Sequence, residues 1–259
     1  MKNEFAKFLN TNEIRFKYAK GMRDIIGKEI HPFHEILFFI DGDAEFVCEG
    51  GSTVLSPYTA VIIPKGTFHC FITNKNEENY TRCAINFEKV SELDELINLK
   101  FQKITLSQDD SLINILLKMK ALFDTPLSEA EQKILLKAYL AQALVSIKSD
   151  ASYLPEVTFS PIIKETLDYI NDNLSTDVSI NKISARLHVS PSNLAHLFKK
   201  ELHIPMHKYV LEKRLILANR KLRDGISPTQ AAIECGFKDY SGFYKQYKKM
   251  FGISPSKKD

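Results

Sequence analysis

The chain has 259 residues, 44% of them hydrophobic, which is enough for two or three packed domains of ordinary size. No apolar run reaches the roughly 20 residues needed to cross a bilayer, which excludes a membrane protein, and the polar N-terminus lacks the apolar stretch of a signal peptide. The net charge of +3 hides an asymmetry. Residues 156–259 carry 17 Lys and Arg against 11 Asp and Glu, whereas the residues before them carry 18 against 21. The basic half is therefore the candidate for nucleic-acid binding.

Short apolar runs alternate with turn residues between about residue 20 and residue 90, a pattern typical of β structure. Gly50 and Gly51 supply the positive φ values that a tight hairpin needs. Short strands at this spacing predict a small barrel or sandwich. The expected strands cover residues 34–40, 44–48, 52–55, 61–63, 69–72 and 82–87.

A helical period follows the strands. The first expected helix covers residues 109–123, and Ser128 with Glu131 forms a capping-box signal that opens a second. These helices either only cover the barrel or also form a dimer interface, and the sequence leaves both alternatives open. The apolar positions expected in the second helix are Ile134, Leu135, Ala138, Leu144 and Val145.

The four cysteines show no C-x-x-C pairing and lie among apolar or strand-like neighbours. We therefore expect free, buried thiols in a reducing cytoplasm, and neither disulfides nor a zinc site. The four are Cys48, Cys70, Cys83 and Cys235.

The basic half contains an internal repeat. After a polar linker at 149–152, the segment Leu194–Leu202 recurs 49 positions later as Phe243–Phe251, with matching apolar positions and a shared Lys-Lys pair. Such a repeat predicts a structural duplication.

Each copy has the pattern of a helix-turn-helix. The first helix needs a small residue where the second crosses it, which Ser184 and Ala232 supply. The turn favours a residue that tolerates positive φ, at His188 and Gly236. A linker helix over residues 206–222, about 25 Å long, would hold the two second helices near one turn of DNA apart. The second helices begin after the polar caps Ser190 and Asp239.

The C-terminal hundred residues resemble the AraC/XylS family of bacterial transcription regulators. The family's usual phenylalanine is replaced by Tyr247, and the Arg that often follows the final Pro is missing. The resemblance implies a sequence-specific DNA-binding regulator that is an activator rather than a repressor, and it does not imply an enzyme. The implied partners are a double-stranded DNA operator and RNA polymerase. The matching residues are Arg214-Leu215, Ala218, Leu222, Ala232, Gly236-Phe237, Asp239, Ser241, Phe243, Lys248-Lys249 and Gly252-Ile253-Ser254-Pro255.

By position within that resemblance, seven side chains are expected to read bases and four lysines to contact phosphates. The alternative to phosphate contact is that these lysines only form a solvated helix face. The base-reading candidates are Ser192, Ala195 and His196 in the first copy and Tyr240, Ser241, Tyr244 and Lys245 in the second. The phosphate candidates are Lys199, Lys200, Lys248 and Lys249.

The N-terminal strands and the segments 29–35 and 64–69 are similar to the cupin barrel that many family members carry. A metal cupin has two histidines one residue apart, then a glutamate and a later histidine. Here a glutamate replaces the first histidine, and we expect neither a functional metal nor another cofactor. The weak metal-ligand candidates are Glu29, His31, Glu35 and His69.

The barrel is expected to sense a small molecule, a sugar among the candidates, and to form a homodimer. A cupin metalloenzyme with a DNA-binding appendage is the competing class, and a barrel that only dimerises or binds a protein antagonist is a third. The expected effector-pocket residues are His31, Phe38, Phe46, Ile62 and His69.

The sequence thus predicts an α+β protein: a cupin-like β-barrel with dimerisation helices, then an all-α domain in which a linker helix joins two helix-turn-helix units. The expected boundaries are 1–107 for the barrel, 108–150 for the connecting helices and 151–259 for the DNA-binding domain. Within that domain they are 179–202, 206–222 and 228–251 for the first unit, the linker helix and the second unit.

Overall fold

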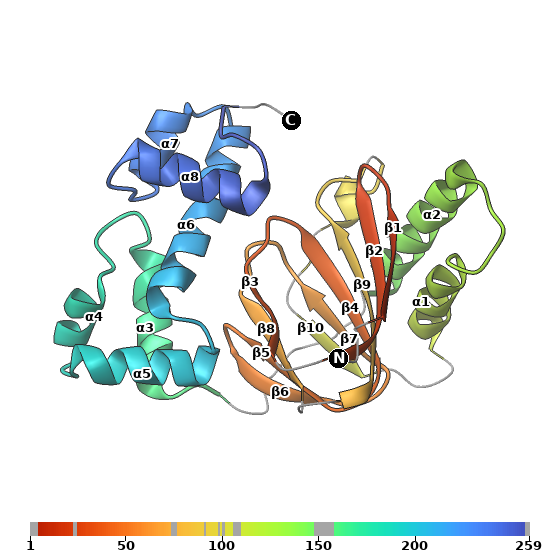
Figure 1. Ribbon diagram of the computed structural model, residues 1–259, viewed down its shortest axis with the longest axis horizontal. Coiled ribbons are helices and arrows are strands. Elements are labelled where there is room, and N and C mark those ends of the chain that lie inside the picture. The colour runs from red at the N-terminus through yellow and green to blue at the C-terminus, as the bar shows by residue number, and fades with distance from the viewer. Residues whose placement is uncertain are drawn as a thin grey trace.

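The computed structural model describes residues 5–22, 25–73, 77–90, 92–97, 99, 102–105, 110–147 and 158–256. The described part is α+β, with a strand-rich N-terminal half and a helical C-terminal half, as the sequence predicts (Figure 1). The strands are β1 (Phe5–Asn10), β2 (Ile14–Met22), β3 (Ile25–Glu29), β4 (His34–Asp41), β5 (Ala44–Cys48), β6 (Gly51–Leu55), β7 (Thr59–Ile63), β8 (His69–Thr73), β9 (Glu77–Phe87) and β10 (Gln102–Thr105). The helices are α1 (Ser111–Ala121), α2 (Glu129–Ile147), α3 (Pro161–Asp172), α4 (Ile180–Arg186), α5 (Pro191–Leu202), α6 (Met206–Arg223), α7 (Pro228–Glu234) and α8 (Tyr240–Phe251), with a 3-10 turn at Asp94–Leu96.

The strands form two antiparallel sheets that face each other. One has the order β1-β2-β9-β4-β7-β10 and the other β3-β8-β5-β6. Between the sheets lies a core with large side chains from both, among them Phe39, Phe46, Phe71 and Tyr80. The all-antiparallel, two-sheet arrangement agrees with the predicted small barrel or sandwich.

Strand register sends neighbouring residues to opposite faces of the larger sheet. In β4, Leu37 and Phe39 point into the core between the sheets, whereas Ile36 and Phe38 pack against α1 and α2. Ile62 lies on the helix-covered face as well. The expectation that Phe38 and Ile62 line a pocket inside the barrel is therefore wrong, because side chains alternate along a strand.

Helices α1 and α2 cover the outer face of the larger sheet (Figure 1). The predicted capping box is present: Glu131 Oε2 accepts a hydrogen bond of 2.8 Å from the Ser128 amide, and Ser128 Oγ accepts one of 3.3 Å from the Glu131 amide. Of the five apolar positions expected in α2, Leu144 is buried, Leu135 is half-buried and the other three are exposed. Ile134 and Val145 are 68% and 59% exposed, and the buried positions are Leu136, Leu140, Ala143, Leu144 and Ile147.

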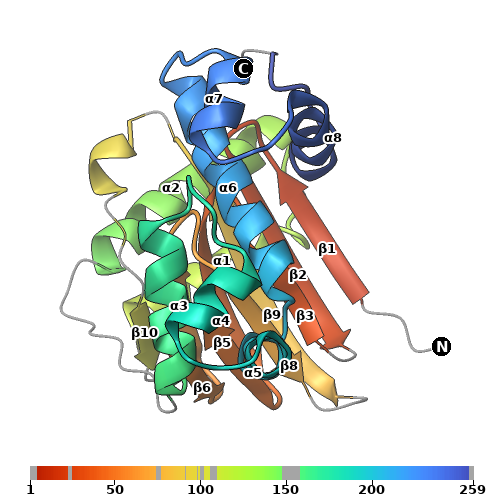
Figure 2. The same ribbon diagram turned by 90° about the vertical axis from the view of Figure 1, so that its left-hand side faces the viewer.

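The barrel and the DNA-binding half share a hydrophobic core. Phe68, from the loop before β8, packs edge-on against Tyr209 of α6 at 5.7 Å between ring centroids. Phe198 of α5 also packs edge-on against Tyr209, at 5.6 Å between ring centroids. In Figure 1, α6 lies between α3 and the barrel, and α7 and α8 lie at its far end, which Figure 2 shows from the side. The helix that links the two helix-turn-helix units is therefore also the helix that contacts the barrel.

All four cysteines are free and buried, as expected from their spacing. Burial raises the pKa of the Cys83 thiol to about 12 and, less strongly, that of Cys235 to about 11. Thiols with these pKa values stay protonated at neutral pH and contribute packing rather than reactivity.

Candidate nucleic-acid interface and barrel cluster

The first helix-turn-helix unit consists of α4 and α5. Ser184 is 2% exposed at the crossing of the two helices, which confirms the need for a small residue there. His188 adopts the expected positive φ, 54°, in the turn. Ser190 caps α5 by accepting a hydrogen bond from the Asn193 amide, and Pro191 occupies the first turn. These local interactions fix where α5 begins and how it projects.

The second unit consists of α7 and α8 and repeats this construction. Ala232 is buried at the crossing, and Gly236 has φ +78° in the turn. Asp239 caps α8 by accepting a hydrogen bond of 2.6 Å from the Gly242 amide. Gly252 ends α8 in the left-handed conformation, with its amide donating to the Lys248 carbonyl. The tandem arrangement predicted from the repeat is present in both copies.

Both second helices bury one face and leave the other in solvent. In α5 the buried residues are Leu194, Phe198 and Leu202, and in α8 they are Phe243 and Tyr247. The seven base-reading candidates all lie off these buried faces, and only Tyr244 is half-buried. Tyr240 is 38% exposed and its ring lies 6.4 Å from that of Tyr244. The α8 surface therefore presents two phenol rings beside the ammonium-bearing Lys245.

The four phosphate candidates are exposed and sit in the last turns of α5 and α8. A surface hollow of about 700 Å³ lies between the two units, and Ala195 and Lys199 are among its lining residues. His207 and Lys238 line the same hollow, and sequence reasoning missed both. Lys238 is exposed and directly precedes the α8 cap Asp239.

The linker helix α6 is fixed to both units. Tyr247, which replaces the family's usual phenylalanine, donates a hydrogen bond of 2.7 Å from its hydroxyl to Asn219 Oδ1 of α6. Arg214 donates from Nε to the Leu174 carbonyl at 2.9 Å and from Nη2 to the Thr176 carbonyl at 2.6 Å. Tyr247 and the half-buried Arg214 therefore both serve to position helices.

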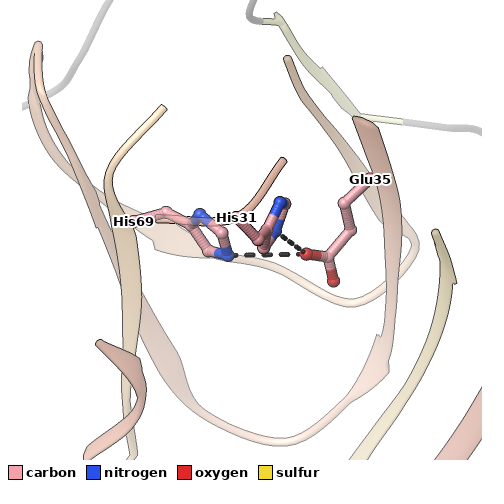
Figure 3. A group of neighbouring side chains, drawn as sticks. All are labelled: His31, Glu35 and His69. Carbon is pink, nitrogen blue, oxygen red and sulfur yellow. Dashed lines mark hydrogen bonds and ion pairs between the residues drawn. The ribbon is translucent and has the colours of Figure 1, made fainter. Parts of the chain in front are cut away.

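Three expected ligands meet inside the barrel (Figure 3). Glu35 Oε2 lies 2.9 Å from His31 Nε2 and 3.4 Å from His69 Nε2, and all three side chains are buried. The His69 ring lies 4.8 Å from that of His31 and 6.2 Å from that of Phe46, measured between centroids. The side chain of Glu29, the fourth candidate, lies outside the described residues.

Backbone carbonyls orient both histidine rings in this cluster. The Phe33 carbonyl lies 2.8 Å from His31 Nδ1, and the Thr67 carbonyl lies 3.2 Å from His69 Nδ1. Since a carbonyl only accepts, each Nδ1 donates to its carbonyl, and each Nε2 faces the Glu35 carboxylate. Burial alone would raise the pKa of the Glu35 carboxyl, but hydrogen bonds from His31 and His69 hold that pKa below its usual value. The two Nε2 atoms and the carboxylate oxygen converge closely enough to share protons in hydrogen bonds or to hold a metal cation.

Comparison with known proteins identifies both halves. A model described as "AraC-like ligand binding domain" matches residues 13–144, half of the chain, and one described as "Helix-turn-helix domain" matches residues 183–258. The chain belongs to the AraC family of DNA-binding transcription regulators, with an N-terminal ligand-binding domain.

Relatives span nearly the whole chain. The probable transcriptional regulator LumQ of Photobacterium leiognathi is 26% identical over 230 residues, which cover 88% of this chain and 89% of the relative. The regulator YdiP of Escherichia coli K12 is 23% identical over 257 residues, 93% and 84% of the two chains. A solved structure of ToxT from Vibrio cholerae aligns with 95% of this chain and 97% of its own, at 10% identity and a TM-score of 0.41. None of the helices in the described part has the length and apolar character to span a bilayer.

Proposed function

We propose that this regulator recognises a specific DNA operator with both helix-turn-helix units, and that the second unit contributes at least as much specificity as the first. The observation that carries the proposal is the pair of capped helices, α5 and α8, whose candidate base-reading faces lie in solvent. Ala195 offers only a methyl group, whereas Tyr240, Tyr244 and Lys245 offer donors and aromatic edges. The richer set lies in the second unit.

Lysines at the ends of α5 and α8 supply the sequence-independent part of the affinity. Lys199, Lys200, Lys248 and Lys249 would neutralise phosphates and release counterions, which makes binding steeply dependent on salt. Specificity is therefore measured at one stated salt concentration.

Selection of bound duplexes from a random library tests operator recognition. We expect an enriched motif with two blocks of constrained bases. A library that emerges without enrichment, although the protein binds DNA, would contradict sequence-specific regulation.

The regulator is further proposed to act as an effector-responsive activator that contacts RNA polymerase, with a small molecule such as a sugar bound at the barrel. Coupling between barrel and DNA-binding half is supported by the loop that joins β7 to β8. The Gly66 amide donates to the His31 carbonyl at 2.9 Å, while Lys213 of α6 donates to the Gly66 carbonyl at 3.3 Å and pairs with Glu49 at 3.0 Å. A ligand at His31 and His69 can then shift α6 through its differential affinity for two arrangements.

A homodimer is proposed to form through α2. Ile134, Ala138 and Val145 follow one helical stripe and are exposed to solvent, a pattern typical of an interface face. Replacing Ile134 and Val145 by Asp should turn a dimer into a monomer in sedimentation velocity. Folding should be almost unaffected, because exposed substitutions usually change stability by no more than about 0.5 kcal/mol.

The matched control for the dimer prediction is Val54→Asp, since Val54 is an apolar residue on β6 with 62% exposure. It should leave sedimentation unchanged. Unchanged sedimentation of the Ile134→Asp, Val145→Asp chain would exclude α2 as the interface.

The barrel cluster favours a second candidate function, metal-dependent sensing, against the expectation of a metal-free barrel. The three ligand atoms of His31, Glu35 and His69 lie within 4.8 Å of one another, and two imidazoles with one carboxylate suit Zn²⁺ or Fe²⁺. A bound metal would fix the two rings and the carboxylate through coordination. Elemental analysis of the purified chain should find about one equivalent of transition metal per chain.

His69→Ala and Glu35→Gln should remove that metal. His34→Gln is the control. His34 is buried on the opposite face of β4 from Glu35, where its ring stacks on Phe87 at 5.8 Å, and it does not belong to the cluster. Metal content that survives His69→Ala, or is absent from the unmodified chain, would reject this candidate.

A further inference from the structure

A second hollow, separate from the barrel cluster, lies between the two halves of the molecule. Its volume is about 530 Å³, within the range of small-molecule sites. The barrel contributes the loop containing Lys65 and the end of β9 with Lys89, and the DNA-binding half contributes α6 and the end of α3. Any molecule bound there would touch both halves at once.

Paired charges hold the walls of this hollow together. Lys213 of α6 pairs with Glu49 of the barrel at 3.0 Å, and Arg223 of α6 pairs with Glu88 at the end of β9. The loop itself is close to α6, since a Cβ on Gly66 would lie 3.3 Å from Ile216 Cγ2. The hollow is therefore a gap within the docked interface, which ion pairs hold on both sides.

The lining has an excess of positive charge. Three carboxylates face five cations, and Lys65, Lys89 and Arg220 form no ion pair with any described residue. Partial burial, followed by the charges of Arg223, Lys89 and Arg220, lowers the pKa of the Lys65 ammonium below its usual value. A dianion would offset this excess. The five cations are Lys65, Lys89, Lys213, Arg220 and Arg223.

We propose that this interdomain hollow binds a phosphorylated, hydroxyl-bearing small molecule whose phosphate lies among Lys65, Lys89 and Arg220. A phosphate monoester carries between about −1.5 and −2 charges at pH 7 and three acceptor oxygens, which matches three cations arriving from two walls. Asn171, Asp172 and Ser175, at the end of α3, supply amide, carboxylate and hydroxyl groups for the ligand's hydroxyls. The inference rests on the proposed effector-responsive function and gives the chemical class of one effector.

Such a ligand would act on the arrangement of the two halves. Because its phosphate contacts cations from the barrel and from α6 together, it binds best when α6 is docked. It would therefore stabilise the docked arrangement by mass action and limit the freedom of the DNA-binding half.

Calorimetric titration of the full chain tests the proposal, with glucose 6-phosphate, inorganic phosphate and glucose as probes. We expect saturable binding of glucose 6-phosphate, weaker binding of inorganic phosphate and none of glucose. Lys65→Gln and Arg220→Gln should each weaken glucose 6-phosphate binding at least about tenfold, since each removes a charge-assisted contact. Lys118→Gln, on the exposed face of α1, should bind like the unmodified chain.

Four results would overturn the proposal. The first is that Lys65→Gln and Arg220→Gln bind glucose 6-phosphate as tightly as the unmodified chain, which would place the phosphate on the DNA-binding face. The second is the absence of saturable phosphate binding. The other two are tighter binding of succinate, or of oleate, than of glucose 6-phosphate. Operator affinity of the ligand-free protein, measured alongside, is independent of this site. If the chain binds its operator but binds no phosphate, the interdomain site is rejected and the proposed function stands.

Discussion

A chain that carries Tyr240→Ala and Lys245→Ala is expected to lose affinity for its operator by at least about thirtyfold, since each good base contact is worth about 1–3 kcal/mol. Lys245 is exposed, and Tyr240, which is 38% exposed, lies at the edge of the core with its ring 5.8 Å from that of Phe243. Their truncation therefore removes no buried side chain of the second unit. Affinity for an unrelated duplex should fall much less, because the four phosphate lysines remain.

Fluorescence anisotropy on operator and scrambled duplexes, at one salt concentration, measures this difference. Gln246→Ala is the matched control, because Gln246 is an exposed α8 residue outside the candidate set. The base-reading role of α8 is wrong if the double variant weakens binding to both duplexes by the same factor.

The change Gly236→Ala is expected to destabilise the second unit by about 2–4 kcal/mol. Gly236 has φ +78°, and a Cβ there would lie 2.9 Å from Arg214 Nη2 and 3.0 Å from the Ser175 carbonyl oxygen. The guanidinium would have to leave its hydrogen bonds to the carbonyls of Leu174 and Thr176. Urea unfolding followed by circular dichroism gives the loss in unfolding free energy.

Gly225→Ala separates backbone strain from crowding. Gly225 has φ +88°, and nothing lies within 4 Å of a Cβ built on it. Its replacement should cost only the left-handed backbone penalty, about 1–2 kcal/mol. If Gly236→Ala and Gly225→Ala lose the same unfolding free energy, then crowding against Arg214 adds nothing to the cost of the change at Gly236.

The helix-turn-helix units could be predicted closely because their signals are local. The caps at Ser190 and Asp239, the turn at Gly236 and the small crossing residues each act within a few positions of the chain. Strands β1 and β2 lie before the expected β region, although buried Ile14 and Phe16 alternate with exposed Arg15, which is a period-2 signal of a strand.

The face of a fully buried element could not be predicted in the same way. From His34 to Phe39 every residue of β4 is buried, so hydrophobicity does not reveal which side chains point between the sheets, and Phe38 was placed on the wrong face. Apolar residues surround α2, so its sequence does not reveal which apolar positions pack on the sheet and which, like Ile134 and Val145, lie in solvent.

Contacts between distant segments had no sequence signal. His31, Glu35 and His69 were grouped because a motif linked them, and the structure brings them together. Lys213 and Glu49 are 164 positions apart and belong to no motif, so the interdomain ion pair and the hollow beside it emerge only from the fold.

The central claim is that two helix-turn-helix units, held by α6, read one operator together. Hydroxyl-radical footprinting of the full chain on the selected operator tests it most directly. The account predicts two protected segments on one face of the duplex, about 34 Å apart, which is one turn of B-DNA. A single protected segment, or two whose spacing varies among selected operators, would contradict it.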